Sequence, residues 1–87
     1  MKEIYNKYCF QILSNDQGMR LRYNGGSIAT QIQEIEISLA EAQCIMAFDD
    51  AMEVSRYVKK ACAERMRMAK TIKPSEYEGE TIKLIMG

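Results

Sequence analysis

The stretch from Ser38 to Lys70 constrains the fold more than any other, because it carries the spacing of one long amphipathic helix. It opens with Ser38-Leu39-Ala40-Glu41, a capping box in which the serine oxygen and the glutamate carboxylate each accept from a backbone N–H. Small and apolar residues then recur at helical intervals. This stripe consists of Ala40, Cys44, Ala47, Ala51, Val54, Val58 and Ala61, with Phe48, Met52 and Cys62 on its flanks. We therefore predict a helix over about residues 39–70.

A helix of that length is longer than the domain that would carry it. At 1.5 Å per residue it would span about 48 Å, whereas a compact chain of 87 residues is about 26 Å across. Asp50-Ala51-Met52-Glu53 is a second cap-like pattern, because aspartate competes for backbone donors. The helix is therefore predicted either to break near Asp50 or to protrude. Lys73-Pro74 marks its end, since proline disfavours helical geometry in the residue before it.

The residues before this helix have the pattern of a β-hairpin. Residues 4–13 are rich in Tyr, Phe and Ile and alternate in polarity, which is typical of a half-buried strand. Residues 14–18 contain Asn, Asp and Gly, which tolerate the left-handed conformations of a tight turn. Residues 18–24 alternate again and predict a second strand, with Arg20 and Arg22 on one side. Asn24-Gly25-Gly26 predicts a further turn.

Residues 29–37 are compatible with either a helix or a strand. Ile28, Ile32, Ile35 and Leu39 recur at helical steps, yet residues 33–37 alternate with a period of two. The density of β-branched residues and the helix start at Ser38 favour a strand. With a last short strand over 81–86, the predicted order is β-β-β-α-β. We expect one domain over residues 1–87, an α+β fold in which a small antiparallel sheet is packed by one long, breakable helix.

Composition indicates a folded, cytoplasmic chain. Hydrophobic residues make up 47% and charged residues 28%, which is too apolar for a disordered chain. No apolar run approaches the ~18 residues of a membrane helix, so we expect no membrane association. The first residues lack the layout of a secretory leader. Three widely spaced cysteines, an odd number, argue against a disulfide framework and favour a reducing compartment.

Few residues in the chain are suited to catalysis. Histidine, the commonest general base, does not occur, and the cysteines form no C-x-x-C pair. Cys44 and Cys62 lie on or beside the apolar stripe and are predicted to be core residues. Asp49 and Asp50 with Glu53 are candidate metal ligands, but a helix cap explains them better because adjacent carboxylates point to different faces. We expect no enzyme activity, no cofactor and no metal.

Two binding functions remain, and the first is recognition of single-stranded nucleic acid. Cations on an open sheet face track a phosphate backbone, and a basic helix end adds phosphate contacts. Residues 8–60, through the hairpin and the run from Ile35 to Leu39, resemble the layout of the PC4-type single-stranded-DNA-binding fold, which implies binding on the sheet face. A net charge of zero counts against this alternative. The candidate contacts, which would also suit an acidic protein, are Lys7, Arg20, Arg22, Arg56, Lys60, Arg67 and Lys70.

The second and favoured function is protein binding. The charges are segregated along the chain, with only acids in residues 31–54 and mostly bases in residues 55–73, which suits a partner with complementary patches. A small domain cannot easily cover the whole apolar stripe, and exposed apolar area marks an interface. We predict a small regulatory or inhibitory protein of phage or mobile-element type, present as a homodimer. The predicted interface consists of Ala47, Phe48, Ala51, Met52, Val54, Val58 and Met66.

Overall fold

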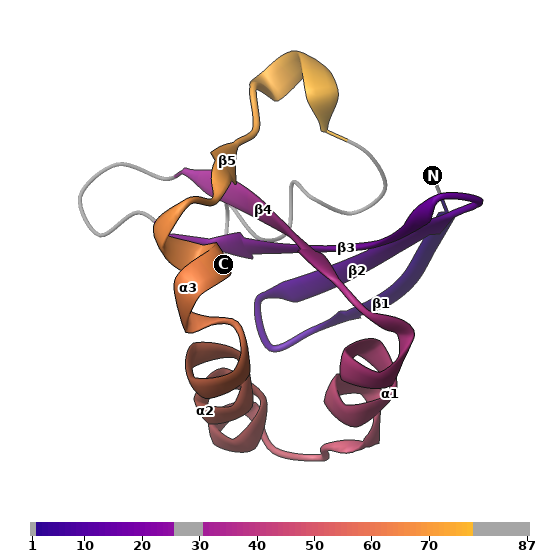
Figure 1. The fold of residues 1–87 in the computed structure, drawn as a ribbon, viewed down its shortest axis with the longest axis vertical. Coiled ribbons are helices and arrows are strands. Elements are labelled where there is room, and N and C mark those ends of the chain that lie inside the picture. The colour runs from indigo at the N-terminus through magenta and orange to yellow at the C-terminus, as the bar shows by residue number, and fades with distance from the viewer. Residues whose placement is uncertain (1, 26–30, 78–87) are drawn as a thin grey trace.

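A computed structural model describes residues 2–25 and 31–77 and shows a five-stranded antiparallel sheet with helices packed against one face (Figure 1). The sheet order follows the chain order, so each strand pairs with the next. The strands are β1 Lys2–Lys7, β2 Phe10–Asn15, β3 Gly18–Asn24, β4 Ile32–Ile37 and β5 Lys70–Thr71. The helices are α1 Leu39–Ala47, α2 Ala51–Ala61, α3 Ala63–Arg67 and the 3₁₀ helix η1 Pro74–Glu76. The predicted α+β class and antiparallel sheet are confirmed.

The predicted first strand, residues 4–13, is in fact two strands joined by a two-residue turn. Tyr8 and Cys9 both have positive φ angles, 57° and 65°, and Lys7 pairs with Phe10 across the turn. This geometry is that of a type I′ hairpin, which normally contains Asn and Gly. The Tyr8 hydroxyl donates to the Asp49 carbonyl oxygen at 2.9 Å and so holds the turn against the loop between α1 and α2. The sheet therefore has one more strand at its start than the sequence indicated.

The second strand and the strand before the helix were predicted correctly. β3 coincides with the expected residues 18–24, and β4, Ile32–Ile37, lies within the expected residues 29–37. Gly18 has a φ angle of 143°, so glycine suits the end of the β2–β3 turn. β5, a two-residue strand paired with β4, was not expected. The expected strand over residues 81–86 lies outside the described residues.

The long helix breaks at the expected place. The Ser38 capping box is present, with Glu41 as its acidic member, and it starts α1. Phe48 and Asp50 have extended backbone, and the Asp50 side chain accepts from the Met52 N–H to start α2. A second interruption at Cys62 separates α2 from α3. Helical structure ends at Arg67, so Lys70 belongs to β5 and not to the helix.

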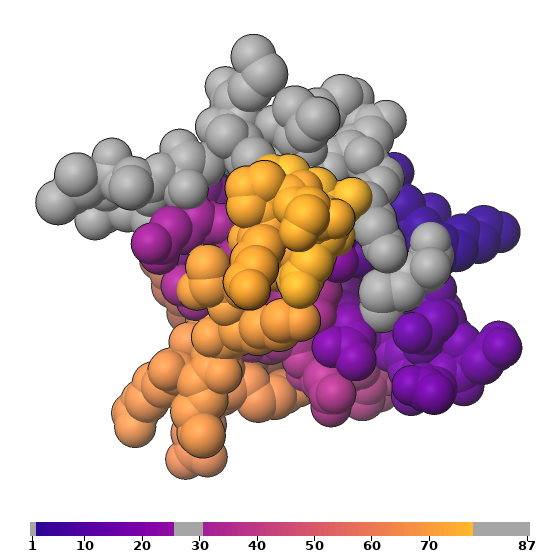
Figure 2. Space-filling view, turned by 90° about the horizontal axis from the view of Figure 1, so that it is seen from above, coloured from indigo at the N-terminus to yellow at the C-terminus, as the bar shows by residue number. Residues whose placement is uncertain are grey.

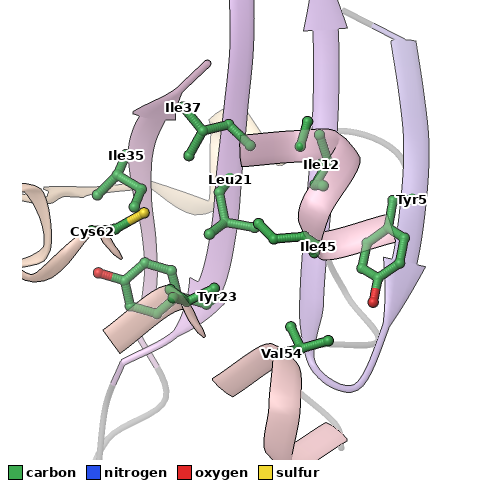
Figure 3. Close-up of a cluster of buried hydrophobic side chains, with 11 residues drawn as sticks. Tyr5, Ile12, Leu21, Tyr23, Ile35, Ile37, Ile45, Val54 and Cys62 are labelled. Atoms are coloured by element: carbon green, nitrogen blue, oxygen red, sulfur yellow. The ribbon is translucent and has the colours of Figure 1, made fainter. Parts of the chain in front are cut away.

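The main core lies between the sheet and the helices (Figure 3). Cross-strand pairing places Ile12, Leu21 and Ile35 in one row at the centre of the sheet, where they face Ile45 of α1. Burial of one such side chain stabilises the fold by about 1.5–3 kcal/mol. The other buried members of this core are Tyr5, Tyr23, Ile37, Ala42, Val54, Val58 and Cys62.

A smaller cluster covers part of the opposite sheet face. Ile32 of β4 packs against Ile72 and Tyr77, and the Ile72 N–H donates to the Ile32 carbonyl oxygen at 2.8 Å. Figure 2 shows this last part of the described chain, β5 and η1 in orange to yellow, lying across the upper face beside β4. In residues 2–25 and 31–77, no helix has the length and apolar character needed to cross a membrane.

Candidate functional site

The sheet face away from the helices carries a row of polar side chains with an ion pair at its centre. The register aligns Asn6, Gln11, Arg22, Glu34 and Lys70 across the five strands. The Arg22 Nε donates to Glu34 Oε2 at 2.9 Å, and both side chains are almost fully buried. A buried charge pair of this kind must remain intact, because loss of one partner leaves an uncompensated charge. Arg22 is therefore a structural residue of the sheet.

The other cations predicted on this face are also engaged or lie elsewhere. Arg20 donates to Glu34 Oε1 at 2.9 Å and lies 3.9 Å from Glu36. Tyr5, two residues before Lys7 in β1, is buried on the helix side of the sheet. Lys7 is exposed at the end of β1. The sheet therefore does not bring its cations together into an open basic surface.

Glu41 and Arg65 join α1, α3 and β4. The Arg65 guanidinium forms a two-pronged ion pair with the Glu41 carboxylate, and its Nη1 also donates to the Glu36 carbonyl oxygen at 2.8 Å. Hydrogen bonding from Arg65 lowers the pKa of Glu41 to about 2, and the hydrogen bonds at Ser38 act in the same direction. The same bond raises the pKa of Arg65. Through these contacts Arg65 holds α3 against both α1 and β4.

The two helical cysteines differ in environment. Cys62 is buried, and burial raises the pKa of its thiol, which keeps it protonated and unreactive. Its placement in the core agrees with the sequence prediction. Cys44 is exposed, so the prediction that it belongs to the core is wrong. In the described residues, no group of three carboxylates or thiolates is arranged to hold a metal ion.

The outer face of α1 is the most unusual surface of the described chain. Only two of its nine residues, Ala42 and Ile45, are buried. Six are exposed, and none of these six is charged; we call them the outer face of α1. They are Leu39, Ala40, Gln43, Cys44, Met46 and Ala47. A helix face toward water normally carries charged residues, so this face has the character of a covered surface.

α2 has the opposite character on its solvent side. Val54 and Val58 are fully buried, whereas Glu53, Arg56 and Lys60 are exposed. Lys59 is exposed as well, beside Arg56 but on the flank that faces Met52 and Ser55. The remaining predicted cations lie elsewhere: Arg67 is exposed at the end of α3, and Lys70 forms an ion pair with Glu76 at 3.4 Å. Arg56 and Lys60 are the two predicted contacts that share one exposed surface.

The structure divides the predicted interface residues between surface and core. Ala47, Ala51 and Met52 are exposed, whereas Val54 and Val58 are fully buried. Phe48 and Met66 are half-buried and pack against the core. The break at residues 48–50 is the reason, because α2 starts with a new rotation and the small-residue stripe passes from the outside to the inside. Leu39 and Ala40 are also exposed, and they were not among the predicted contacts.

A shallow groove lies on α2 beside Phe48, the residue that follows α1. It has a volume of about 260 Å³ and is lined by Phe48, Glu53, Arg56, Tyr57 and Lys60. The Phe48 and Tyr57 rings form its floor, with centroids 5.6 Å apart. Burial raises the pKa of Tyr57, and a hydrogen bond with the Cys44 thiol adds to that shift. The Cys44 contact makes the groove continuous with the outer face of α1.

A larger groove, about 440 Å³, lies between β4 and α3. Its charged lining is mostly paired within the chain: Arg20 with Glu34, Arg65 with Glu41, and Lys70 with Glu76. A ligand there would have to compete with these pairs.

Comparison with protein-family models, curated proteins and solved structures found no match. The functional argument therefore depends on the surfaces themselves.

Proposed function

We propose that this protein is a non-catalytic interaction domain that binds another protein through the outer face of α1. The observation that carries the proposal is the lack of charge on the six exposed residues of that helix. Leu39 is 58% exposed and Met46 is 38% exposed, so apolar area is left in contact with water. Contiguous exposed apolar surface marks interaction sites in soluble proteins.

The proposed role is regulatory or inhibitory, in a reducing cytoplasm. A binding face carried on short helices and locked to the sheet by Glu41 and Arg65 suits a domain that acts by occupying a partner's surface. The exposed thiols of Cys9 and Cys44 fit a reducing compartment. The homodimer remains a prediction. Light scattering over a concentration series tests it, and a monomer throughout would exclude it.

Single-strand nucleic-acid binding is the alternative, favoured only by the exposed cations of α2. Arg22 is buried, and Arg20 and Lys70 are paired. Lys7 and Arg67 are exposed on other elements, so the predicted contacts that share one surface are Arg56 and Lys60, and Lys59, which was not predicted, lies beside them. A polythymidine oligonucleotide bound through these residues would show a steep loss of affinity with salt. Absence of binding at low salt would exclude this alternative.

Retention of a host protein on the immobilised chain tests the proposed function. The Ala47→Glu variant places a charge on the outer face of α1, at the last residue of the helix, and we expect it to lose the retained protein. The matched control is Ala63→Glu, which makes the same change at an exposed alanine of α3 and should retain it. Circular dichroism checks that both variants are folded. Equal retention by both variants would refute the proposal.

A further inference from the structure

We propose that the partner presents an acidic amphipathic helix, which lies in the groove on α2 beside Phe48 and against the neighbouring outer face of α1. Its apolar side would cover the outer face of α1, and its carboxylates would pair with Arg56 and Lys60. This inference rests on the proposed function and specifies the chemistry of the partner at the same site.

The groove supplies a continuous apolar track. Phe48 follows α1 directly, and its ring packs on Tyr57 of α2 at a centroid distance of 5.6 Å. The Tyr57 hydroxyl contacts Cys44 of α1. The exposed residues Ala40, Cys44 and Ala47 then extend the track along α1. A ligand seated here would contact apolar groups on both helices.

The small side chains along this track favour a helix as the occupant. Ala40 and Ala47 have methyl side chains and Cys44 is little larger, so another backbone can approach α1 closely. Helices pack at interaxial distances of about 8–10 Å, with the shortest distances where small residues line the contact. α1 and α2 lie next to each other on the same side of the sheet (Figure 1). Two neighbouring helices form the kind of groove into which an amphipathic helix binds with its apolar face.

The charges beside the track select an acidic partner. Arg56 and Lys60 line the groove together with one acid, Glu53, which leaves a net charge of +1 from the three side chains. Among residues 2–25 and 31–77, no carboxylate forms an ion pair with Arg56 or Lys60. Cations on one side of an apolar strip attract and orient a helix with acids at the matching position.

A second copy of the chain fits the groove less well. The outer face of α1 has no carboxylate, and Glu53 is the only acid on the groove side of α2. A symmetric pair therefore supplies no counter-charge from α1 for Arg56 and Lys60 of the other copy. Its buried surface would also be small, because α1 has only nine residues and a stable interface needs about 800 Å² from each partner.

Three designed peptides of about 20 residues, each about three helical turns longer than α1, test the proposal. All carry the same leucine and alanine stripe; one has glutamate beside the stripe, one has lysine there, and one has the glutamate sequence in scrambled order. We expect fluorescence anisotropy at about 0.05 M salt to show binding of the glutamate peptide and at least tenfold weaker binding of the other two. The affinity should fall as salt is raised, since the ion pairs are exposed.

Adjacent lysines provide the matched variants. Lys60→Glu changes the charge inside the groove, whereas Lys59→Glu makes the same change on the opposite flank of α2. We expect Lys60→Glu to weaken binding of the glutamate peptide about tenfold or more and to strengthen binding of the lysine peptide. Lys59→Glu should change either affinity by no more than about threefold. Ala47→Glu should abolish binding of the glutamate peptide.

Four results would overturn the proposal. If Lys59→Glu and Lys60→Glu weaken the glutamate peptide's binding equally, the charge effect is diffuse and does not depend on the groove. If polythymidine binds more tightly than the peptide and both variants weaken its binding equally, the surface binds nucleic acid. Self-association that Ala47→Glu abolishes and the glutamate peptide does not inhibit would identify a second copy as the occupant. If no peptide binds but Ala47→Glu still fails to retain the host protein, the acidic helix is rejected and the proposed function stands. If Ala47→Glu also keeps the host protein, the proposed function fails as well.

Discussion

α1 and α2 make similar contributions to the core but have different surfaces toward solvent. α1 buries Ala42 and Ile45, and α2 buries Val54 and Val58. The exposed side of α2 carries four charged residues, whereas the exposed side of α1 carries none. The charged residues of α2 lie on its solvent side and Val54 and Val58 lie inside, although Met52 near its start is 67% exposed. Every exposed residue of α1 is uncharged, and the proposal of a partner rests on this difference.

The largest expected change in the free energy of unfolding comes from a substitution on the buried face of α1, and a substitution on its outer face should change it little. Ile45→Ala should lower the free energy of unfolding by about 2–5 kcal/mol, because it leaves a cavity at the centre of the core. Leu39→Ala, at a site 58% exposed, should change it by no more than about 0.5 kcal/mol while weakening partner binding. Urea unfolding of both variants checks the contrast. Similar losses from the two variants would mean that the outer face of α1 is part of the fold.

The next effect concerns the ion pair that holds α1 against α3. Arg65→Met should cost about 1–3 kcal/mol, since it leaves the partly buried Glu41 carboxylate without its main partner. The pKa of Glu41 is about 2 in the folded chain, below its usual value of about 4.3. Because the pKa of Glu41 is lower in the folded chain, the ion pair stabilises the fold fully at pH values above the pKa of the unfolded chain. This stability is lost as the pH falls from about 4.3 towards 2.

The free energy of unfolding, measured at about pH 7 and about pH 2.5, therefore tests whether the Glu41–Arg65 pair causes the loss of stability in acid. The wild type should lose more stability than Arg65→Met over this interval, because the variant has already lost the pair. Glu41→Gln is the control and should also show the smaller dependence. Equal pH dependence in all three chains would show that the pair does not set the acid sensitivity.

A smaller effect tests the independent start of α2. Asp50→Ala removes the side chain that accepts from the Met52 N–H at 2.8 Å. We expect a cost of about 1 kcal/mol, the usual value of an N-cap. Ser38→Ala at the start of α1 should cost at least as much, because a capping box is lost with it. A neutral Asp50→Ala variant would argue that α2 needs no cap of its own.

The smallest effects distinguish two tyrosines of the β1–β2 hairpin. In the described chain, the buried Tyr5 hydroxyl has no hydrogen-bond partner. Tyr5→Phe should therefore raise the free energy of unfolding, by up to about 1 kcal/mol. Tyr8→Phe should lower it by about 0.5–1 kcal/mol, because the bond to the Asp49 carbonyl oxygen is lost. Thermal unfolding gives both signs, and a destabilised Tyr5→Phe variant would contradict this reasoning.

Local chemistry made much of this fold predictable. The capping box at Ser38, the cap at Asp50 and the alternation in residues 33–37 depend on near neighbours, and each gave the correct element. The turn at Tyr8 and Cys9 was missed because neither residue favours a positive φ angle. The turn is held by Asp49, more than 40 positions away in the chain. A contact at that distance leaves no local pattern.

The candidate site was only partly predictable, for a related reason. The small-residue stripe lies on α1 and α2, but its face depended on the loop at residues 48–50, which resets the rotation of α2. Val54 and Val58 therefore moved into the core, and Ala40 and Cys44 moved to the surface. Charge segregation was informative about pairing inside the chain, since the acidic Glu41 binds the basic Arg65. Sequence alone could not separate such internal pairs from a binding surface.

Protection of the Cys44 thiol tests the central claim most directly. The measurement uses a chain with Cys9→Ser and Ser75→Cys, which places a control thiol on exposed η1, across the sheet from α1. Maleimide labelling is followed with and without the protein recovered in the retention experiment, and buried Cys62 should stay unlabelled. If the outer face of α1 binds the partner, labelling at Cys44 slows at least tenfold and labelling at position 75 is unchanged. An unchanged rate at Cys44 in the saturated complex would contradict the account.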